Sequence, residues 1–111
     1  MATFATVQQL ARALPGAEEG TSYRTPAFRV RGKLFARLHE QEDVLVVRMD
    51  LGDREVLTRS APAIYFVTPH YEPWPFVLVR LPNIDRAELH GLLTDAWRLS
   101  APKRLAATLD R

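Results

Sequence analysis

Residues 25–49 read TPAFRVRGKLFARLHEQEDVLVVRM, and this stretch decides the fold. It contains three runs rich in β-branched and aromatic residues, at 27–31, 34–39 and 44–49, separated by Gly32-Lys33 and by an acidic tip at 40–43. Such runs, bounded by turn residues, are typical of strands. Because the connections are short, neighbouring strands must run antiparallel. The stretch therefore predicts an antiparallel sheet in the middle of the chain.

The segments around this stretch add further elements. Residues 64–68 and 76–81 have the same strand-like character, and a brief helix is expected around residues 53–59. The polar segment 18–25, which contains Gly20, reads as a loop or a short edge strand before Pro26. The sheet is therefore predicted to have about five strands.

A helix is predicted at each end of the chain. Thr3 suits an N-cap, and apolar residues recur after it at helical spacing until Pro15-Gly16 ends the segment. The second long helix begins at Asp85, which forms a capping box with Glu88, and a short helix follows Pro102. Together these elements predict the α+β class: a two-layer α/β domain whose N- and C-terminal helices pack on one face of the sheet.

Trp97 follows Leu89, Leu93 and Ala96 on the apolar face of the second long helix. Helical spacing directs this face towards the sheet. We therefore expect Trp97 to be a core residue, packed near Phe28 or Val30.

Length and composition favour one cytoplasmic domain spanning residues 1–111. The chain is 47% hydrophobic and 25% charged, which is close to the globular average. It has no cysteine, its apolar runs are far shorter than a membrane span, and no basic segment leads into an apolar one at the N-terminus. These features exclude disulfides, thiol catalysis and a membrane anchor.

The charges are unevenly distributed along the chain. The formal net charge is only +2, but the sequence pI is about 9.4, and only Lys33 and Lys103 among the 15 basic residues are lysine. No Asp or Glu falls in the five predicted strands, whereas arginines occur in four of them, at positions 29, 31, 37, 48 and 80. With helices on one face, these arginines are expected on the open face, where they would either contact phosphates or cover apolar residues with their stems.

The grouping of the arginines depends on the turn between the first two strands. A three-residue loop, Arg31-Gly32-Lys33, places Arg29 and Arg37 on the same face, whereas a two-residue Gly32-Lys33 turn places them on opposite faces. We favour the longer loop, because it packs Val30 against Leu34.

A second candidate site is the loop at residues 68–75, which contains His70, Tyr71 and Trp74 among three prolines. It reads either as the lining of a recess or as a stiff connection whose Trp74 closes the edge of the core. No metal site or cofactor is predicted, because the three histidines are far apart in the sequence and no phosphate-binding or dinucleotide motif is present. The chain also lacks a nucleophile motif, so no enzymatic activity is expected.

The sequence resembles the MmcQ/YjbR family of bacterial proteins. The resemblance rests on Leu14-Pro15-Gly16, on residues 25–37, on Val67-Thr68-Pro69-His70-Tyr71, on residues 77–81, and on segments at 96–98 and 101–105. It implies a two-layer domain related to double-wing DNA-binding folds, and a DNA-binding role. The basic residues that match family positions are Arg29, Arg31, Lys33, Arg37, Lys103 and Arg104.

The sequence supports two hypotheses about function. The first is weak, salt-sensitive DNA binding by a monomer or homodimer, with these six basic residues contacting phosphates. The second is binding of a protein partner or small ligand by His70, Tyr71 and Trp74, with no nucleic-acid role. Arginines free of carboxylates favour the first, whereas pairing of Arg29 or Arg37 to acids of the 40–43 tip weakens it.

Overall fold

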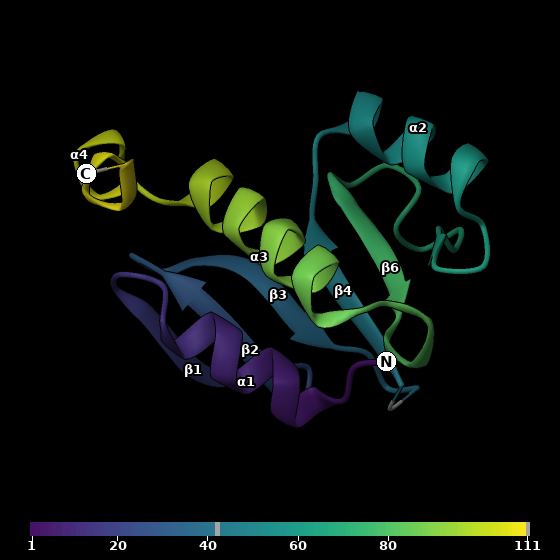
Figure 1. The fold of residues 1–111 in the computed structure, drawn as a ribbon, viewed down its shortest axis with the longest axis horizontal. Coiled ribbons are helices and arrows are strands. Elements are labelled where there is room, and N and C mark those ends of the chain that lie inside the picture. Colours follow the sequence, from purple (N-terminus) through teal and green to yellow (C-terminus); the bar gives the residue numbers. More distant parts are fainter. Residues whose placement is uncertain (42, 111) are drawn as a thin grey trace.

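The computed structural model describes residues 1–41 and 43–110, which form a six-stranded antiparallel sheet with helices packed against it (Figure 1). The strands lie in the spatial order β1-β2-β3-β4-β6-β5. Their bounds are β1 Ala17–Ser22, β2 Thr25–Val30, β3 Lys33–Leu38, β4 Val44–Arg48, β5 Tyr65–Phe66 and β6 Phe76–Arg80. The predicted fold class is confirmed, with one strand more than expected.

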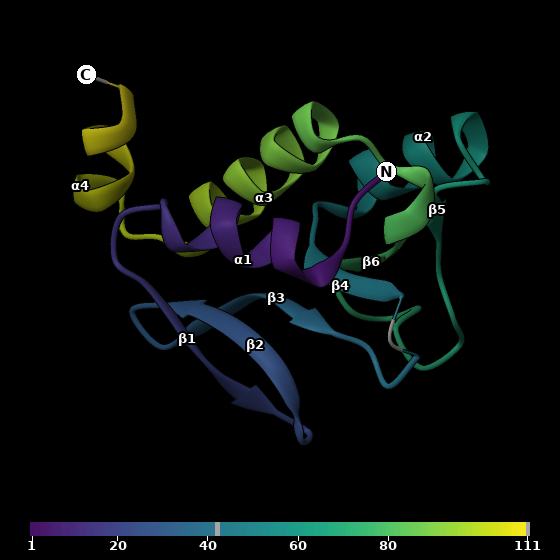
Figure 2. The same cartoon turned by 60° about the horizontal axis from the view of Figure 1, so that its bottom comes forward.

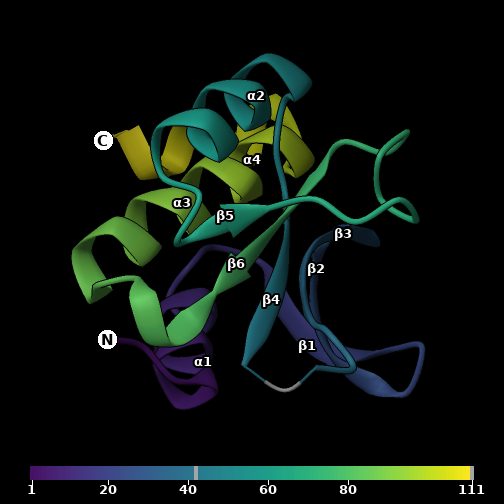
Figure 3. The ribbon, with the colours of Figure 1, turned by 90° about the vertical axis from the view of Figure 1, so that its right-hand side faces the viewer.

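The helices leave one face of the sheet open. Helices α1 (Phe4–Arg12) and α3 (Arg86–Ser100) lie side by side over one face, as Figure 2 shows. Helix α2 (Leu51–Ser60) packs beside β5 and β6, and α4 (Lys103–Ala106) follows α3. The 3-10 turns η1 (Leu81–Asn83) and η2 (Ala107–Asp110) follow β6 and α4. Figure 3 shows the segment between β5 and β6 and the β1–β2 turn projecting on the side away from α1 and α3.

The main core lies between the sheet and helices α1 and α3. Trp97 of α3 is fully buried there, in one cluster with Phe28 and Val30, as predicted. Its indole Nε1 donates a hydrogen bond of 2.8 Å to the carbonyl oxygen of Pro15, so the one polar atom of the side chain is satisfied. The predicted burial of Trp97 in the core beside the sheet is confirmed.

Asp85 is the N-cap of helix α3 as expected, but the capping box is only half formed. The Asp85 carboxylate accepts a 2.7 Å hydrogen bond from the backbone N–H of Glu88. The Glu88 carboxylate does not return to the cap, because it accepts a hydrogen bond from the Tyr65 hydroxyl of β5. Burial of Tyr65, reinforced by this bond, raises the pKa of its hydroxyl. A tertiary contact has therefore replaced a local one.

Strand β1 is the element that the sequence left undecided. It pairs along its whole length with β2, from Ala17 opposite Val30 to Ser22 opposite Thr25. Its central residues are exposed, so it shows no apolar alternation from which a strand could be predicted. It also brings Glu18 and Glu19 into the sheet, so the complete sheet is not free of acidic residues.

The predicted three-residue loop between β2 and β3 is wrong. The structure has a two-residue turn, Arg31-Gly32, with φ values of 50° and 80° and with Val30 opposite Lys33. Both turn residues have the positive φ that a type I′ hairpin requires. The predicted contact between Val30 and Leu34 is also wrong, because Val30 lies in the helix-side core and Leu34 lies opposite Arg29 on the open face.

A β-bulge nevertheless keeps Arg29 and Arg37 on the same face. With this two-residue turn and regular pairing, Arg37 would lie opposite Pro26 and point towards the helices. The register instead shifts after the Arg29–Leu34 pair, so that Ala36 lies opposite Phe28 and Arg37 opposite Ala27. The predicted grouping of these two arginines therefore holds, but for a different structural reason.

Candidate functional site

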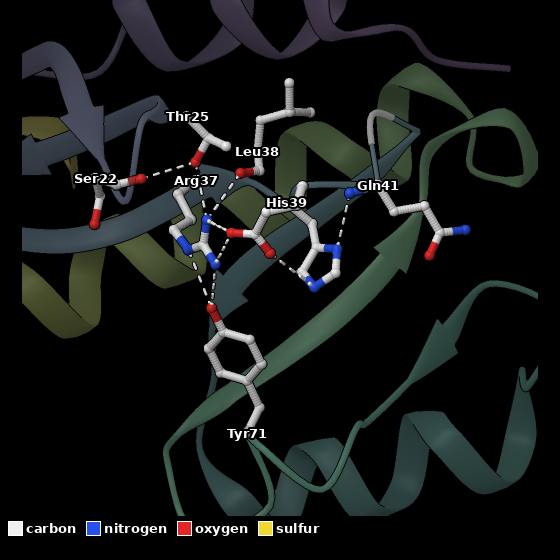
Figure 4. Close-up of polar contacts among 8 residues, drawn as sticks. Ser22, Thr25, Arg37, Leu38, His39, Gln41 and Tyr71 are labelled. Atoms are coloured by element: carbon white, nitrogen blue, oxygen red, sulfur yellow. Dashed lines mark hydrogen bonds and ion pairs between the residues drawn. The ribbon is translucent and has the colours of Figure 1, made fainter.

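Arg37 lies at the centre of a hydrogen-bond network on the open face (Figure 4). Its Nε and Nη2 donate to the hydroxyl oxygen of Tyr71 at 3.0 and 2.7 Å. Nη1 donates to Thr25 Oγ1 at 2.8 Å and to the carbonyl of Leu38 at 3.1 Å, and both terminal nitrogens donate to Glu40 Oε1. The residue is 4% exposed and all five of its N–H groups point at protein acceptors. Arg37 therefore has no free donor for the phosphate contact predicted from the sequence.

Glu40 supplies the counter-charge of Arg37. Its Oε1 lies 3.0 Å from Arg37 Nη2, and its Oε2 lies 3.5 Å from Nε2 of His39. Burial alone would raise the pKa of Glu40, but the hydrogen bonds and charge of Arg37 outweigh it, and the pKa is lowered. The acidic tip thus neutralises Arg37, which is the outcome that weakens DNA binding through this arginine. Glu42 of that tip lies outside the described residues.

An aromatic recess surrounds the exposed edge of this network. Two adjoining hollows of about 310 and 240 Å³ share Tyr23, Arg37, His70 and Tyr71 in their walls. The first is completed by His39, Glu40 and Thr68, and the second by Leu34, Trp74 and Phe76. We call this combined surface the aromatic recess. All three residues of the predicted loop site therefore line one surface.

Two large exposed aromatic side chains of the recess come from different parts of the chain. Trp74 is 56% exposed and Tyr23 is 78% exposed. By contrast, Tyr71 is buried in a small apolar cluster on this face, with its ring edge-on to Phe76 at 6.1 Å between centroids. Trp74 does not close the core, as one reading of the loop proposed, but stands open to solvent.

Tyr23 is a recess residue that the sequence did not indicate. It occupies the β1–β2 turn together with Arg24, and both have positive φ, 52° and 68°. Bulky residues at such φ values are uncommon and carry strain. Because Tyr and Arg stand where Gly or Asn usually marks a turn, the sequence showed no sign of this hairpin. The turn holds the Tyr23 ring with its centroid 5.3 Å from Arg37 Cζ.

Arg54 of helix α2 fixes the loop that carries Trp74. Its Nη1 donates to the carbonyl oxygens of Tyr71, Trp74 and Phe76 at 2.9–3.2 Å, and its Nη2 donates to that of Glu72 at 2.9 Å. One side chain therefore binds three carbonyls of the loop at residues 68–75 and the carbonyl of Phe76 that follows it. Nothing in the sequence pattern singled out Arg54, because its partners are backbone atoms that carry no sequence signal.

The remaining basic candidates lie around the turn of the β2–β3 hairpin and on α4. Arg31 lies in the exposed hairpin turn and Lys33 follows it, and Lys103 and Arg104 are exposed on α4. Arg31 and Arg104 line one shallow hollow with Pro102, Leu105 and Thr108. Arg29 is half-buried on the open face, where Nη1 donates to the carbonyl of Thr21 at 3.0 Å. We call these five basic residues the basic edge.

The residues of the basic edge form no ion pair with any residue that the structure describes. Over residues 1–41 and 43–110, the ion pairs of Arg and Lys join Arg12 to Glu19, Arg37 to Glu40 and Arg59 to Glu55, and the His39 imidazole lies 3.5 Å from Glu40. Glu18 lies opposite Arg29 across the β1–β2 ladder without forming an ion pair with it. Four residues of the basic edge are therefore exposed cations, and Arg29 is a half-buried one.

Arg48 and Arg80 complete the open face by stacking on aromatic rings. The Arg48 guanidinium carbon lies 5.0 Å from the centroid of Phe76, and its Nε donates to the carbonyl of Leu34 at 2.9 Å. Burial lowers the pKa of Arg48. Arg80 lies 4.0 Å over the ring of Phe66. Both therefore cover apolar surface with their stems, as the second reading of the strand arginines expected.

The described residues contain neither a metal-binding cluster nor a membrane-spanning helix. No three or more His, Cys, Asp or Glu side chains among them are close enough to hold a metal ion. None of their helices is both long and apolar enough to cross a membrane.

The architecture and the sequence together define the protein class. A family model described as YjbR matches residues 12–99, and the chain belongs to this family. The resemblance read from the sequence is thereby confirmed. Strands β1 to β6 and most of α3 fall within the matched range, so the open face belongs to the family domain.

Known relatives extend this assignment without naming an activity. The uncharacterised proteins Rv2570 of Mycobacterium tuberculosis and Mb2600 of Mycobacterium bovis are each 44% identical to this chain over 64 residues. The match covers 57% of this chain and 50% of each relative, so it spans about half the length of those proteins. A crystal structure of Deinococcus radiodurans protein DR2400, with family-model domain DUF419, superposes with a TM-score of 0.80 at 20% identity over 99% of this chain and 89% of that one. This likeness shows the fold.

Proposed function

We propose that the protein binds nucleic acid through the basic edge. The observation that carries the proposal is the position of Arg31 and Arg104, which come from distant parts of the sequence yet line one hollow, neither with a carboxylate partner in the described structure. Arg29 and Lys33 extend this group along β2 and β3, and Lys103 extends it along α4. Exposed arginines and lysines that are not neutralised by acids are the groups that contact phosphates.

The binding is expected to be weak and governed by salt. Arg37 is neutralised and takes no part, so about four of the five remaining cations would contact phosphates. Each neutralised phosphate of a duplex adds about −0.9 to the slope of log K against log salt, which gives a slope of about −3.6. The hairpin turn would act as a projecting wing, with Arg29 behind it on the sheet.

Fluorescence anisotropy with a labelled duplex at low salt tests this proposal. The double variant Arg31→Gln/Arg104→Gln should weaken binding and make the salt slope shallower by about two. The matched control is Arg59→Gln/Arg86→Gln, which removes the same charge at α2 and at the start of α3, far from α4 (Figure 1). Equal losses in the two variants would show only an effect of net charge. No binding at tens of micromolar protein would reject the function.

The aromatic recess supports a second candidate, binding of a partner or small ligand with no nucleic-acid role. The exposure of Trp74 and Tyr23 on a surface otherwise held rigid by Arg37 and Arg54 favours it. Under this function, a Trp74→Ala variant would lose the ligand-induced thermal shift or pull-down, whereas Arg31→Gln/Arg104→Gln would retain both. The opposite pattern would support the basic edge.

A further inference from the structure

We propose that the aromatic recess binds the base of an unpaired nucleotide, so that the protein prefers single-stranded to duplex nucleic acid. This inference rests on the proposed function, because the phosphates that follow the inserted base along the same strand would contact Arg29 and the rest of the basic edge. It adds a site and a substrate class that phosphate contacts alone do not give.

The walls of the recess have the chemistry that holds a flat heteroaromatic ring. Trp74 and Tyr23 present large exposed rings from two separate turns, and Leu34 and Phe76 contribute apolar surface to the same hollow. Bases stack on such rings with little regard to sequence. The hollow that contains Trp74 has a volume of about 240 Å³ and the adjoining one about 310 Å³, near the lower end for small-ligand sites.

The recess is also fixed in shape before any ligand arrives. Arg54 binds the carbonyl oxygens on both sides of Trp74, and the Tyr71 hydroxyl accepts two hydrogen bonds from the buried Arg37. Tyr23 is held over the same guanidinium by its turn. A loop whose backbone is already ordered loses little conformational entropy when a ring stacks on the side chains it carries, which favours binding.

Charge complementarity selects a nucleotide over an uncharged aromatic ligand. Arg48 contacts two residues of the recess wall, with its guanidinium over Phe76 and its Nε bound to the carbonyl of Leu34. Arg29 lies opposite Leu34 in the β2–β3 ladder. Neither arginine forms an ion pair within the described residues, whereas the one acid of the recess, Glu40, is bound to Arg37 and His39. The flanks of the recess thus suit the phosphates on either side of an inserted base.

A paired base cannot use this site without leaving its stack. In a duplex, both faces of each base are covered by neighbours, and extruding one base costs unpairing and unstacking energy. A single strand presents its base faces freely and would lay one in the recess while its phosphates extend towards Arg29 and the basic edge. The geometry therefore predicts tighter binding to single strands at equal charge.

Tryptophan fluorescence gives a direct readout of this contact. The chain has two tryptophans, and Trp97 is fully buried while Trp74 is exposed in the recess. Titration with a thymidine oligomer of about ten nucleotides should quench Trp74 and give a tighter Kd than a duplex of the same length. An abasic oligomer with the same phosphates should bind without quenching.

Variants separate the recess from the basic edge. Trp74→Ala and Tyr23→Ala should each weaken single-strand binding about tenfold and leave duplex binding unchanged, and Trp74→Phe should retain most of the affinity. Arg31→Gln/Arg104→Gln should weaken both. Thermal melting of each variant reports whether the fold is intact, and the exposure of both aromatic residues predicts a melting temperature near that of the parent.

The outcomes distinguish failure of this inference from failure of the proposed function. Equal affinity for single strand and duplex without quenching overturns the recess assignment and leaves the basic edge standing. Quenching of Trp74 by millimolar thymidine monophosphate, with no binding of either polymer, supports base stacking in the recess but rejects the preference for single strands and the basic edge. Absence of both quenching and polymer binding overturns both.

Discussion

The two faces of the sheet are both largely buried, but helices cover one face and only side chains cover the other, open face. On one face, helices α1 and α3 close an apolar core that contains Trp97 and the inward residues of β2, β3, β4 and β6. On the other, a smaller apolar cluster around Val46, Tyr71 and Leu78 has no helix over it. Its cover is made of arginine stems and aromatic rings, with guanidinium groups bonded to hydroxyl and carbonyl oxygens.

This difference shows why the number of arginines on a sheet overstates its free positive charge. All four arginines of the open face donate hydrogen bonds to protein oxygens, but one of them alone has a carboxylate partner within the described chain. The four are Arg29, Arg37, Arg48 and Arg80, and the one with a carboxylate partner is Arg37. An arginine on a sheet face can therefore be a covering residue, a buried structural cation or a solvent-facing charge. The partners of its N–H groups distinguish these roles.

The largest expected effect tests the helix-side core. Trp97→Ala removes a fully buried indole and its hydrogen bond to Pro15, and should lower the free energy of unfolding by about 3–5 kcal/mol. That is a large part of the roughly 5–15 kcal/mol that holds a domain of this size together. Urea denaturation followed by circular dichroism measures it. Trp74→Ala is the control, and should change stability by less than about 0.5 kcal/mol because its side chain is exposed.

If Trp97→Ala remained nearly as stable as the parent while binding was lost, Trp97 would belong to a ligand site. The division between the closed face and the open face would then be misplaced.

The second prediction tests whether Arg37 is structural. Arg37→Leu leaves the Tyr71 hydroxyl and the Thr25 side chain without their donor, and should cost about 1–3 kcal/mol in unfolding free energy. The cost stays below that of breaking a fully buried ion pair, because Glu40 is 59% exposed and is rehydrated when its partner is removed. Urea denaturation at neutral pH gives the value.

Arg31→Leu is the matched control, since Arg31 is exposed at the hairpin turn and should change stability by less than about 0.5 kcal/mol. The structural role would be contradicted if Arg37→Leu left the unfolding free energy unchanged and made the salt slope of nucleic-acid binding shallower by about one. That result would make Arg37 a phosphate contact after all.

Much of the fold could be predicted from the sequence, because its strong local patterns agree with the tertiary structure. Residues 25–49 form β2, β3 and β4 close to the predicted bounds, and Asp85 caps α3 as expected. Strand β1 could not be predicted, because an edge strand exposed on both sides needs no apolar alternation. Its pairing depends on backbone hydrogen bonds, which leave no trace in residue type.

The candidate site was predictable only in part, for a related reason. His70, Tyr71 and Trp74 were visible as an unusual local cluster, and the structure brings them to one recess. Tyr23 and Arg54 were not, because one depends on a hairpin without turn residues and the other on contacts to carbonyls. The β-bulge that keeps Arg29 and Arg37 on one face depends on strand register, which composition does not encode.

The smallest expected effect concerns the charge of Glu40. Its pKa is lowered in the folded protein, so the Arg37–Glu40 pair stabilises the fold above the ordinary carboxyl pKa of 4.5 and loses this contribution as pH falls through the lowered value. Glu40→Gln keeps an acceptor oxygen for Arg37 but removes the charge. At neutral pH it should cost well under about 1 kcal/mol, because solvent screens an exposed carboxylate. Urea denaturation of both proteins between pH 7 and pH 3 gives the difference in stability, in which other carboxylates such as Glu19 cancel. This difference should shrink as the pH falls below 4.5, and a constant difference across that range would mean that shape, not charge, gives Glu40 its role on the open face.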